Sequence, residues 1–317
     1  MDAEQLEAER ARLAARHGEW TAHNIHLGGR AYTFAASDPR FEAQLVGHGQ
    51  HLRRVMQIAA DVTGRPLAQL RVLDLACLEG LYGVEFARHG AEVVGIEGRE
   101  ANLEKARFAK DALGLDRFTL ELNDVRNLTA AKHGRFDVVL CLGILYHLDA
   151  PDVFSFIERM AEVCTCVTII DTQVAVKLNR TVTHGGAQYR GYSYVEPGAD
   201  EAERVSLKWA AMGNPRSFWF SRPSLFNALT RAGFSSVYTC QSPAVPAQQL
   251  DRDTIVAIKG EPVTLASTPA VNAIGVEMWP ETSAVGLHPT QQGFFERGNL
   301  LRRAARAGRD TLRRVLG

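Results

Sequence analysis

Acidic side chains stand near the ends of two neighbouring strand-like runs between residues 70 and 97. The run RVLDLA contains Asp74, and the next run, AEVVGIE, ends on Glu97. Between them lie a loop of small and turn-forming residues, which reaches Gly80 and Gly83, and a helical stretch. In an open α/β sheet, ligands bind beyond the carboxyl ends of the strands. A carboxylate at Glu97 could accept two hydrogen bonds from a ribose diol, so this segment predicts a site for a nucleotide-like cofactor.

Two cofactors of this kind have different requirements. Nicotinamide dinucleotides need GxGxxG at a helix start, where the helix N-terminus binds the pyrophosphate. Here the window from Ala76 to Gly80 has one glycine and places Glu79 where a pyrophosphate would be repelled. S-adenosylmethionine has no phosphate but carries an ammonium and a sulfonium, so Asp74 and Glu79 suit its methionine end and Glu97 its ribose. The sequence therefore favours S-adenosylmethionine.

Candidate general bases are found at two places in the chain. Tyr146 and His147 directly follow a strand-like run, where they either line a substrate site or pack in the core. His184 precedes Gly185-Gly186, an arrangement suited to a mobile lid and also to a solvated loop. Histidine is the side chain best matched to proton transfer at neutral pH. We expect His147 or His184 to act as a base if the acceptor needs one, with Asp171 as the next candidate.

The elements that would position these residues alternate between strand-like and helical runs from about 70 to 171. The strand-like runs are RVLDLA, AEVVGIE, FTLEL, FDVVLCLG and CVTIID, and helical patterns end at Arg88 and cover 99–113 and 151–163. Parallel strands need crossover connections, so the alternation predicts a parallel sheet. A helix over 222–232 and two closing strands suggest an added antiparallel hairpin. The fold class is α/β: a doubly wound, Rossmann-like, seven-stranded, mostly parallel sheet with an antiparallel last strand.

Three regions follow from this pattern. Residues 1–66 form an N-terminal extension that helps to cover the ligand, with helices over 1–17 and 41–63. Residues 67–260 form the main domain, with an inserted lid at 172–215, and 261–317 form a peripheral tail that ends in a basic amphipathic helix. The helix over 41–63 has an apolar face. A group of aromatic residues later in the chain is expected either in the core or as a wall of the acceptor pocket. The face comprises Leu45, Leu52, Val55, Met56, Ile58 and Ala59, and the aromatic group comprises Trp209, Phe218, Trp219 and Phe220.

Composition and charge exclude several classes of protein. Hydrophobic residues make up 46% and charged residues 23%, which indicates a globular chain. Lys plus Arg and Asp plus Glu number 36 each, so no global field attracts nucleic acid or an anionic membrane. No apolar run approaches the roughly 18 residues of a membrane span, and the acidic first residues do not resemble a signal peptide. We therefore expect a cytoplasmic protein.

The cysteines indicate whether the chain has a metal site, and the basic tail indicates which partners it could contact. The five cysteines are scattered in apolar surroundings with no CxxC pair, so we expect buried small hydrophobes and no metal site. The arginine-rich tail from Arg297 could contact an anionic surface or partner, or be a solvated helix. Neither pattern predicts an oligomeric state.

At these motifs the chain resembles the class I S-adenosylmethionine-dependent methyltransferases. Asp74 to Gly80 is similar to their first motif, DxGxGxG, with Ala76 and Leu78 in place of two glycines. Glu97 corresponds to the acid after their second strand, NDVRNL at 123–128 to the segment whose aspartate contacts adenine, and FDVVLCLGILYHL at 136–148 to their fourth motif. The resemblance implies cofactor binding by Asp74, Ala76, Cys77, Glu79, Gly80, Glu97, Gly98, Asp124, Val125, Cys141 and Leu142.

A narrower resemblance is visible in the flanking segments. WTAHNIHLGG, LGILYHLDAP and PRSFWFSRPSLFNALTRAGF resemble the tRNA wobble-uridine carboxymethyltransferase branch and its relatives, in which the first segment and the LYH tyrosine lie near the ligand. The balanced charge weighs against tRNA as a substrate. We therefore expect methyl transfer to a small molecule such as a secondary metabolite or sugar, most simply on oxygen. A tRNA-modifying transferase and a non-catalytic cofactor-binding scaffold remain the alternatives.

Overall fold

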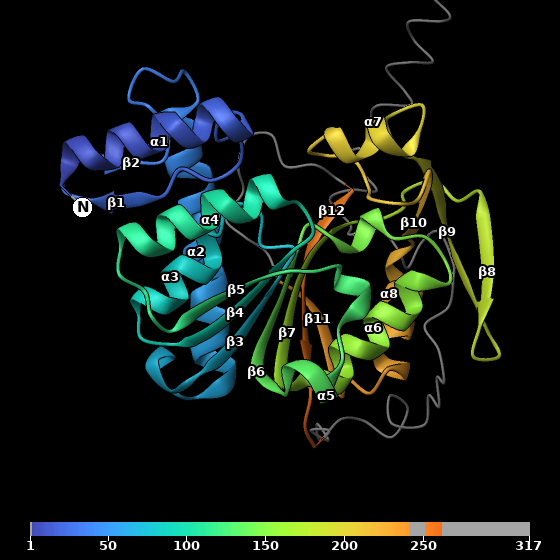
Figure 1. The fold of residues 1–317 in the computed structure, drawn as a ribbon. Helices are drawn as coiled ribbons and strands as arrows, with labels where there is room; N and C mark the ends of the chain where they lie inside the picture. The colour runs from blue at the N-terminus through green and yellow to red at the C-terminus, as the bar shows by residue number, and fades with distance from the viewer. Residues whose placement is uncertain (1, 241–250, 262–317) are drawn as a thin grey trace, which may run out of the picture.

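The computed structural model describes residues 2–240 and 251–261, and its centre is a seven-stranded sheet with the strand order β5-β4-β3-β6-β7-β12-β11 (Figure 1). The strands are β3 (Arg71–Leu75), β4 (Glu92–Glu97), β5 (Phe118–Leu122), β6 (Phe136–Leu142), β7 (Cys164–Gln173), β11 (Ser236–Cys240) and β12 (Arg252–Ile258). Strands β3 to β7 pair in parallel, whereas β12 is antiparallel to both of its neighbours. The predicted fold class is confirmed.

Helices cover both faces of the sheet (Figure 1). On one face lie α2 (Phe41–Thr63), α3 (Leu81–Arg88) and α4 (Glu100–Ala112), and on the other lie α5 (Ala130–His133), α6 (Asp152–Val163) and α8 (Arg222–Arg231). The N-terminal helix α1 (Ala3–His17) packs against α4. Within the described ranges, no helix has both the length and the apolar character that a bilayer span demands.

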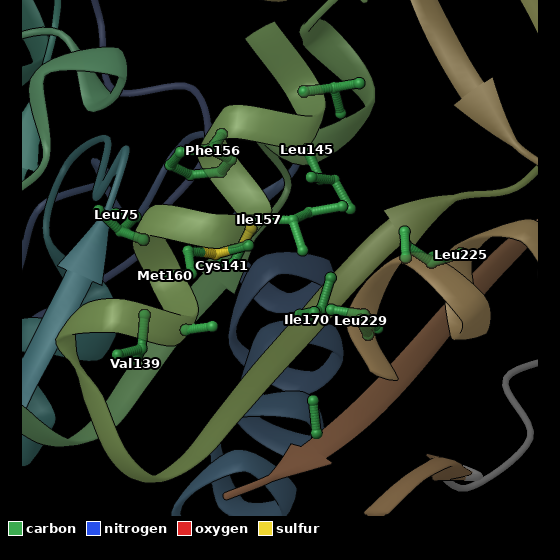
Figure 2. Packing of buried hydrophobic residues seen from close by; sticks show 14 of the residues in the cluster. Leu75, Val139, Cys141, Leu145, Phe156, Ile157, Met160, Ile170, Leu225 and Leu229 are labelled. Carbon is green, nitrogen blue, oxygen red and sulfur yellow. The ribbon is translucent and has the colours of Figure 1, made fainter. Parts of the chain in front are cut away.

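Alternating apolar residues in the strands build a core on each face. Along β6, Val138 and Leu140 join the cluster under α2 and α3, whereas Val139 and Cys141 join the cluster under α6. Successive side chains of a strand point to opposite faces, so a continuous apolar run suits a strand that is buried on both sides. Figure 2 shows how Met160 of α6 lies beside Cys141 at this second interface. The resulting rigid sheet fixes the positions of the loops at its carboxyl edge.

The insertion at 172–215, predicted as a lid, contains regular strands. Strands β8 (Arg180–His184), β9 (Ala187–Val195) and β10 (Arg216–Phe220) form an antiparallel three-stranded sheet, and α7 (Glu201–Ser206) lies between β9 and β10. Gly185 and Gly186, with φ of 54° and 76°, form the two-residue turn between β8 and β9. Two-residue hairpins favour turns with positive φ, which glycine adopts readily. The glycine pair, which the sequence placed in a lid or a solvated loop, forms a hairpin turn.

Most other local expectations are confirmed, with exceptions among the apolar residues. Phe218 and Phe220 are buried as core, and Trp219 is half-buried. Trp209 is 56% exposed and lies on the wall of the cavity at the carboxyl edge of the sheet. In α2 the buried residues are Val55, Ile58 and Ala59, whereas Leu45, Leu52 and Met56 are half-buried. The N-terminal extension also contains a small hairpin of β1 (His26–Gly28) and β2 (Ala31–Tyr32). The predicted basic tail helix lies outside the described residues.

Candidate active site

A cavity of about 510 Å³ opens at the carboxyl edge of the parallel strands. Residues that end or follow β3, β4, β5 and β6 line it, together with Asp171 of β7. Parts of the N-terminal extension and of residues 204–212, here called the cover segment, complete the wall. The volume is within the range of about 300 to 1,000 Å³ that is typical of cofactor and small-molecule sites. The structure therefore contains a cavity at the place where the strand ends predicted a site.

The loop between β3 and α3 has the backbone shape that glycines would favour. Ala76 and Leu78, which replace two motif glycines, have φ of 52° and 50°, in the left-handed region. Gly80, at the start of α3, has φ of 88°. The N–H of Cys77 donates to the Ile96 carbonyl at 3.1 Å and fastens the loop to β4. The loop thus keeps a glycine-like path although two of its residues have side chains.

Glu97 ends β4 and lines the cavity, as expected for a ribose-binding acid. It is 2% exposed, and its carboxylate accepts the N–H groups of Leu78 and Arg99 at 2.9 Å each and the side-chain amide of Asn102 at 3.2 Å. An ionised carboxylate has about four acceptor positions. These three donors therefore hold Glu97 in place and leave capacity for a ligand hydroxyl.

Three further predicted cofactor residues line the cavity: Gly98 directly after β4, and Asp124 and Val125 after β5. The Asp124 carboxylate accepts the Arg126 N–H at 2.8 Å and pairs with the Arg126 guanidinium at 2.6 Å. Burial by itself would raise the pKa of Asp124, but Arg126 holds that pKa below its ordinary value. Asp124 is therefore ionised and oriented, and its contact with adenine remains a prediction.

Asp74 does not line the cavity, and we correct its expected role. The carboxyl is 2% exposed and accepts the Gly83 N–H at 3.0 Å, which joins the end of β3 to α3. Burial raises the pKa of Asp74 to about 7, and nearby Glu97 adds to that rise. Asp74 therefore supports the strand–helix junction at the start of the β3–α3 loop.

Glu79 is also directed away from the cavity, into a buried cluster. Its oxygens accept three consecutive backbone N–H groups of residues 21–23 at 2.9 to 3.0 Å. Lys208 is paired with the same carboxylate at 2.5 Å, and Lys105 lies 3.7 Å away. Burial alone would raise the pKa of Glu79, but Lys208 and the other donors hold it below its ordinary value. We correct Glu79 from a ligand contact to the anchor that joins the N-terminal extension to the cover segment.

The cover segment is fastened to the cofactor end of the cavity at further points. Arg99 donates to four of its carbonyls, those of Arg204, Val205, Leu207 and Ala210. Met212 packs so closely on Gly98 that a Cβ there would lie 3.0 Å from its sulfur. A side chain at position 98 would therefore require Met212 to shift by a few tenths of an ångström.

His147 is brought to the cavity together with a carboxylate that the sequence did not indicate. Nδ1 of His147 lies 3.2 Å from Oε1 of Glu196, which is 3% exposed. The Glu196 carboxylate also accepts the Ala211 N–H at 3.0 Å and the Ser217 hydroxyl. Burial would raise the pKa of Glu196, but these donors hold it below its ordinary value. A carboxylate at Nδ1 fixes the proton on that nitrogen and makes Nε2 the basic one.

A second acid–histidine contact lies on the wall formed by β7 and α2. Asp171 is 3.3 Å from Nε2 of His51 and 2.5 Å from the Arg252 guanidinium, and Nδ1 of His51 is 2.6 Å from the Tyr82 hydroxyl. The Arg252 guanidinium also lies over the ring of Tyr146, 5.8 Å from its centroid. Burial would raise the pKa of Asp171, but His51 and Arg252 hold it below its ordinary value. The Asp171 carboxylate also accepts the Thr254 hydroxyl at 3.3 Å, so three side chains of the protein contact it.

The structure does not bring His184 to this site. Its Nε2 is 2.8 Å from Glu158, its ring stacks on Phe154, and it lines a separate hollow of about 180 Å³. Cys77, Gly80 and Cys141 lie behind the cavity wall, whereas Ala76, Leu142 and Tyr146 line it. No group of three or more metal-ligating side chains comes together in the part of the chain that the structure describes.

The family comparison agrees with this geometry. Residues 72–166 match the family model described as a methyltransferase domain. The matched stretch begins in β3 and ends in β7, so it contains the β3–α3 loop, Glu97, Asp124 and His147. Over this stretch the chain is therefore similar to methyltransferase domains, in agreement with the motif resemblance.

Two curated relatives are similar to part of this chain. The chain is 32% identical to the ubiquinone biosynthesis O-methyltransferase of Azorhizobium caulinodans over 54% of this chain and 60% of that protein. It is also 32% identical to the enzyme of the same name from Ruegeria pomeroyi, over 55% of this chain and 64% of that protein. The match thus spans less than two thirds of each relative. These relatives are not tRNA-modifying enzymes, so they do not support the narrower tRNA-branch resemblance.

A solved structure matches over most of the chain. The N-terminal domain of EvdMO1, crystallised in the presence of SAH and D-fucose, superposes with a TM-score of 0.62. The alignment covers 82% of this chain and 98% of that domain, at 24% sequence identity. This likeness shows that the two chains share a fold, including regions outside the segment matched by the family model.

Proposed function

We propose that this chain transfers the methyl group of S-adenosylmethionine to a hydroxyl oxygen of a small-molecule acceptor. The observation that carries the proposal is the 3.2 Å contact between Glu196 and His147, because His147 lines the same cavity as Glu97 and Asp124. A hydroxyl acceptor must lose its proton, and a histidine held by a carboxylate is suited to receive it. The names of the two curated relatives support methylation on oxygen.

The polar groups around the cavity fit S-adenosylmethionine better than a dinucleotide. Glu97 has spare acceptor capacity for a ribose hydroxyl, and Ala76 and Leu78 are in conformations that let loop backbone approach a ligand. The β3–α3 loop has one glycine, Gly80, in the window where a dinucleotide site needs several for its pyrophosphate. This donor and acceptor set suits a cationic, phosphate-free nucleoside.

Each group of the chain then has a task in the reaction. S-adenosylmethionine, when bound, supplies a methyl group on a positively charged sulfur. Glu97 would hold the ribose and Asp124 the adenine. Nε2 of His147 would take the acceptor's hydroxyl proton while the oxygen–carbon bond forms, the carbon–sulfur bond breaks and its electron pair passes to sulfur. Glu196 would stabilise the resulting imidazolium, and the cover segment would exclude water.

Methyl-labelled S-adenosylmethionine tests the proposal. The protein is incubated with labelled cofactor and either a metabolite extract or bulk tRNA, and the products are separated by mass spectrometry. We expect label in a small-molecule fraction, with S-adenosylhomocysteine as the co-product. Label in tRNA alone would replace this proposal with tRNA modification, and binding of cofactor without any transfer would indicate a non-catalytic scaffold.

A further inference from the structure

One face of α2 changes from apolar to polar where it reaches the cavity. Gln44, His48, His51 and Val55 follow one another at spacings of four, three and four residues, so they lie on the same face of the helix. Val55 is fully buried in the core, whereas the three polar residues line the cavity. A face that only packed against the sheet would have remained apolar, so these three side chains call for a different explanation.

All three polar residues contain a buried atom that has no hydrogen-bond partner among the described residues. For His51 this atom is Nε2, although it lies 3.3 Å from the Asp171 carboxylate. The side-chain oxygen of Gln44 and Nδ1 of His48 are inaccessible to solvent and have no hydrogen-bond partner within the described residues. Buried polar atoms are nearly always paired in native proteins. The terminal torsion of glutamine is soft, so a small rotation turns its amide toward a ligand. A ligand with hydroxyl groups would supply the missing partners, because a hydroxyl both donates and accepts.

The cavity has no uncommitted cation for an anionic ligand among the described residues. Four cationic side chains line it, and each is already engaged: Lys208 with Glu79, Arg252 with Asp171, Arg126 with Asp124, and Arg99 with backbone carbonyls.

Two buried histidines of this wall, His23 and His48, add no positive charge. Burial lowers the pKa of His23 to about 3, and it also lowers the pKa of His48. The Leu81 N–H donates to Nδ1 of His23 at 3.3 Å, which places the proton of that neutral ring on Nε2. A carboxylate or phosphate beside His23 and His48 would therefore be desolvated without an uncommitted cation next to it.

We propose that Gln44 and His48 form an acceptor-recognition subsite that takes a neutral molecule with at least two hydroxyl groups. One hydroxyl would react beside His147, and the second would pair with the α2 subsite. This inference rests on the proposed methyltransferase function and adds to it a substrate class and two specificity-determining residues.

Matched probes separate neutral from acidic acceptors. Binding to the SAH-saturated protein is measured by saturation-transfer NMR for D-fucose against D-galacturonic acid, and for catechol against protocatechuic acid. We expect at least one neutral probe to bind, and its acidic partner to bind at least about ten-fold more weakly. Equal or tighter binding of the acidic partner, or no binding of either neutral probe, would overturn the inference.

Variants on α2 test the two residues themselves. Gln44→Met and His48→Phe should each lower the affinity for the neutral probe by about three- to ten-fold. The melting temperature should not fall, since each change removes an unpaired polar atom from a buried site. Gln57→Ala is the matched control, because Gln57 is exposed on the same helix and does not line the cavity. Unchanged probe affinity in both variants would contradict the assignment.

A titration with SAH, carried out first, distinguishes a failure of the proposed function from a failure of the acceptor inference. A wild-type protein that fails to bind SAH refutes the proposed function itself. A protein that binds SAH but prefers the acidic probes, or is indifferent to Gln44 and His48, refutes only the acceptor inference.

Discussion

Replacing Glu196 with glutamine tests whether a charged partner on His147 drives proton removal. Glutamine has nearly the same shape and still accepts the Ala211 N–H through its oxygen, but it has no negative charge to stabilise an imidazolium. General-base catalysis contributes about 10² to 10⁴-fold in rate. The His147–Glu196 separations of 3.2 and 3.3 Å exceed the roughly 2.7 to 2.9 Å of the strongest charge-assisted hydrogen bonds. We therefore expect the lower end, about a hundred-fold fall in kcat.

Single-turnover transfer of labelled methyl groups measures this loss separately from cofactor binding. His147→Ala should lose about as much rate as Glu196→Gln, and the double variant should lose little more, because residues that act as one unit are not additive. SAH affinity should be nearly unchanged in all three proteins. Ser217→Ala, which removes a neutral donor to the same carboxylate, serves as a control with a smaller effect. Full turnover in Glu196→Gln, or additive losses in the double variant, would refute the reasoning.

Three further predictions concern stability. Glu79→Gln leaves buried lysines without their anion and should lower the free energy of unfolding by about 3 to 5 kcal/mol in urea titrations, whereas Glu92→Gln at an exposed ion pair should cost under about 1 kcal/mol. Folding raises the pKa of Asp74 from 3.8 to about 7, so its contribution to stability is lost as pH rises between these values, whereas the lowering of the His23 pKa from 6.5 to about 3 costs stability as pH falls through that range. In thermal melts from pH 4 to 7, the melting temperature of Asp74→Asn, relative to that of the wild type, should therefore fall toward acidic pH. The melting temperature of His23→Gln, relative to that of the wild type, should fall toward neutral pH. A relative melting temperature that changes with pH in the same direction in both variants would contradict these pKa shifts. Leu78→Gly relieves a left-handed side chain at φ of 50° and should change stability by no more than about 1 kcal/mol, so a larger loss would show that the side chain is needed.

The sheet and its cofactor edge could be predicted because local patterns determine them. Continuous apolar runs such as the one around Val138 to Cys141 are typical of strands buried on both faces, and their alternation with helices leaves few topologies. Parallel strands end at one edge, so Glu97, Asp124 and His147 were expected near each other from their strand ends alone.

The contacts of Asp74 and Glu79 depend on tertiary structure that the motif does not encode. Both acids lie in or next to the β3–α3 loop, where the sequence suggests a ligand contact. Asp74 instead accepts the Gly83 N–H, and Glu79 accepts N–H groups from residues 21–23, more than 50 positions earlier. A motif gives the place of a carboxylate along the chain, but not which buried donor it meets.

Glu196 and the polar face of α2 were missed for related reasons. Glu196 follows β9 in the insertion, where no recognised motif surrounds it, and it meets His147 only because β9 and β10 pair. Gln44 and His48 look like ordinary solvated positions beside half-buried leucines, and the cavity that they line forms only when α2 packs on β7. The one sequence signal was the i, i+4, i+7, i+11 series that ends in the core residue Val55.

Calorimetric titration of SAH into the wild-type protein and into Glu97→Ala tests the central claim most directly. Removing Glu97 deletes a charge-assisted acceptor worth about 1.5 to 3 kcal/mol to a bound ribose, so we expect SAH to bind the wild type and to bind the variant about ten- to a hundred-fold more weakly. The circular dichroism spectrum should be retained, which separates lost affinity from lost fold. Binding of NAD in place of SAH, or equal SAH affinity in the two proteins, would contradict the account.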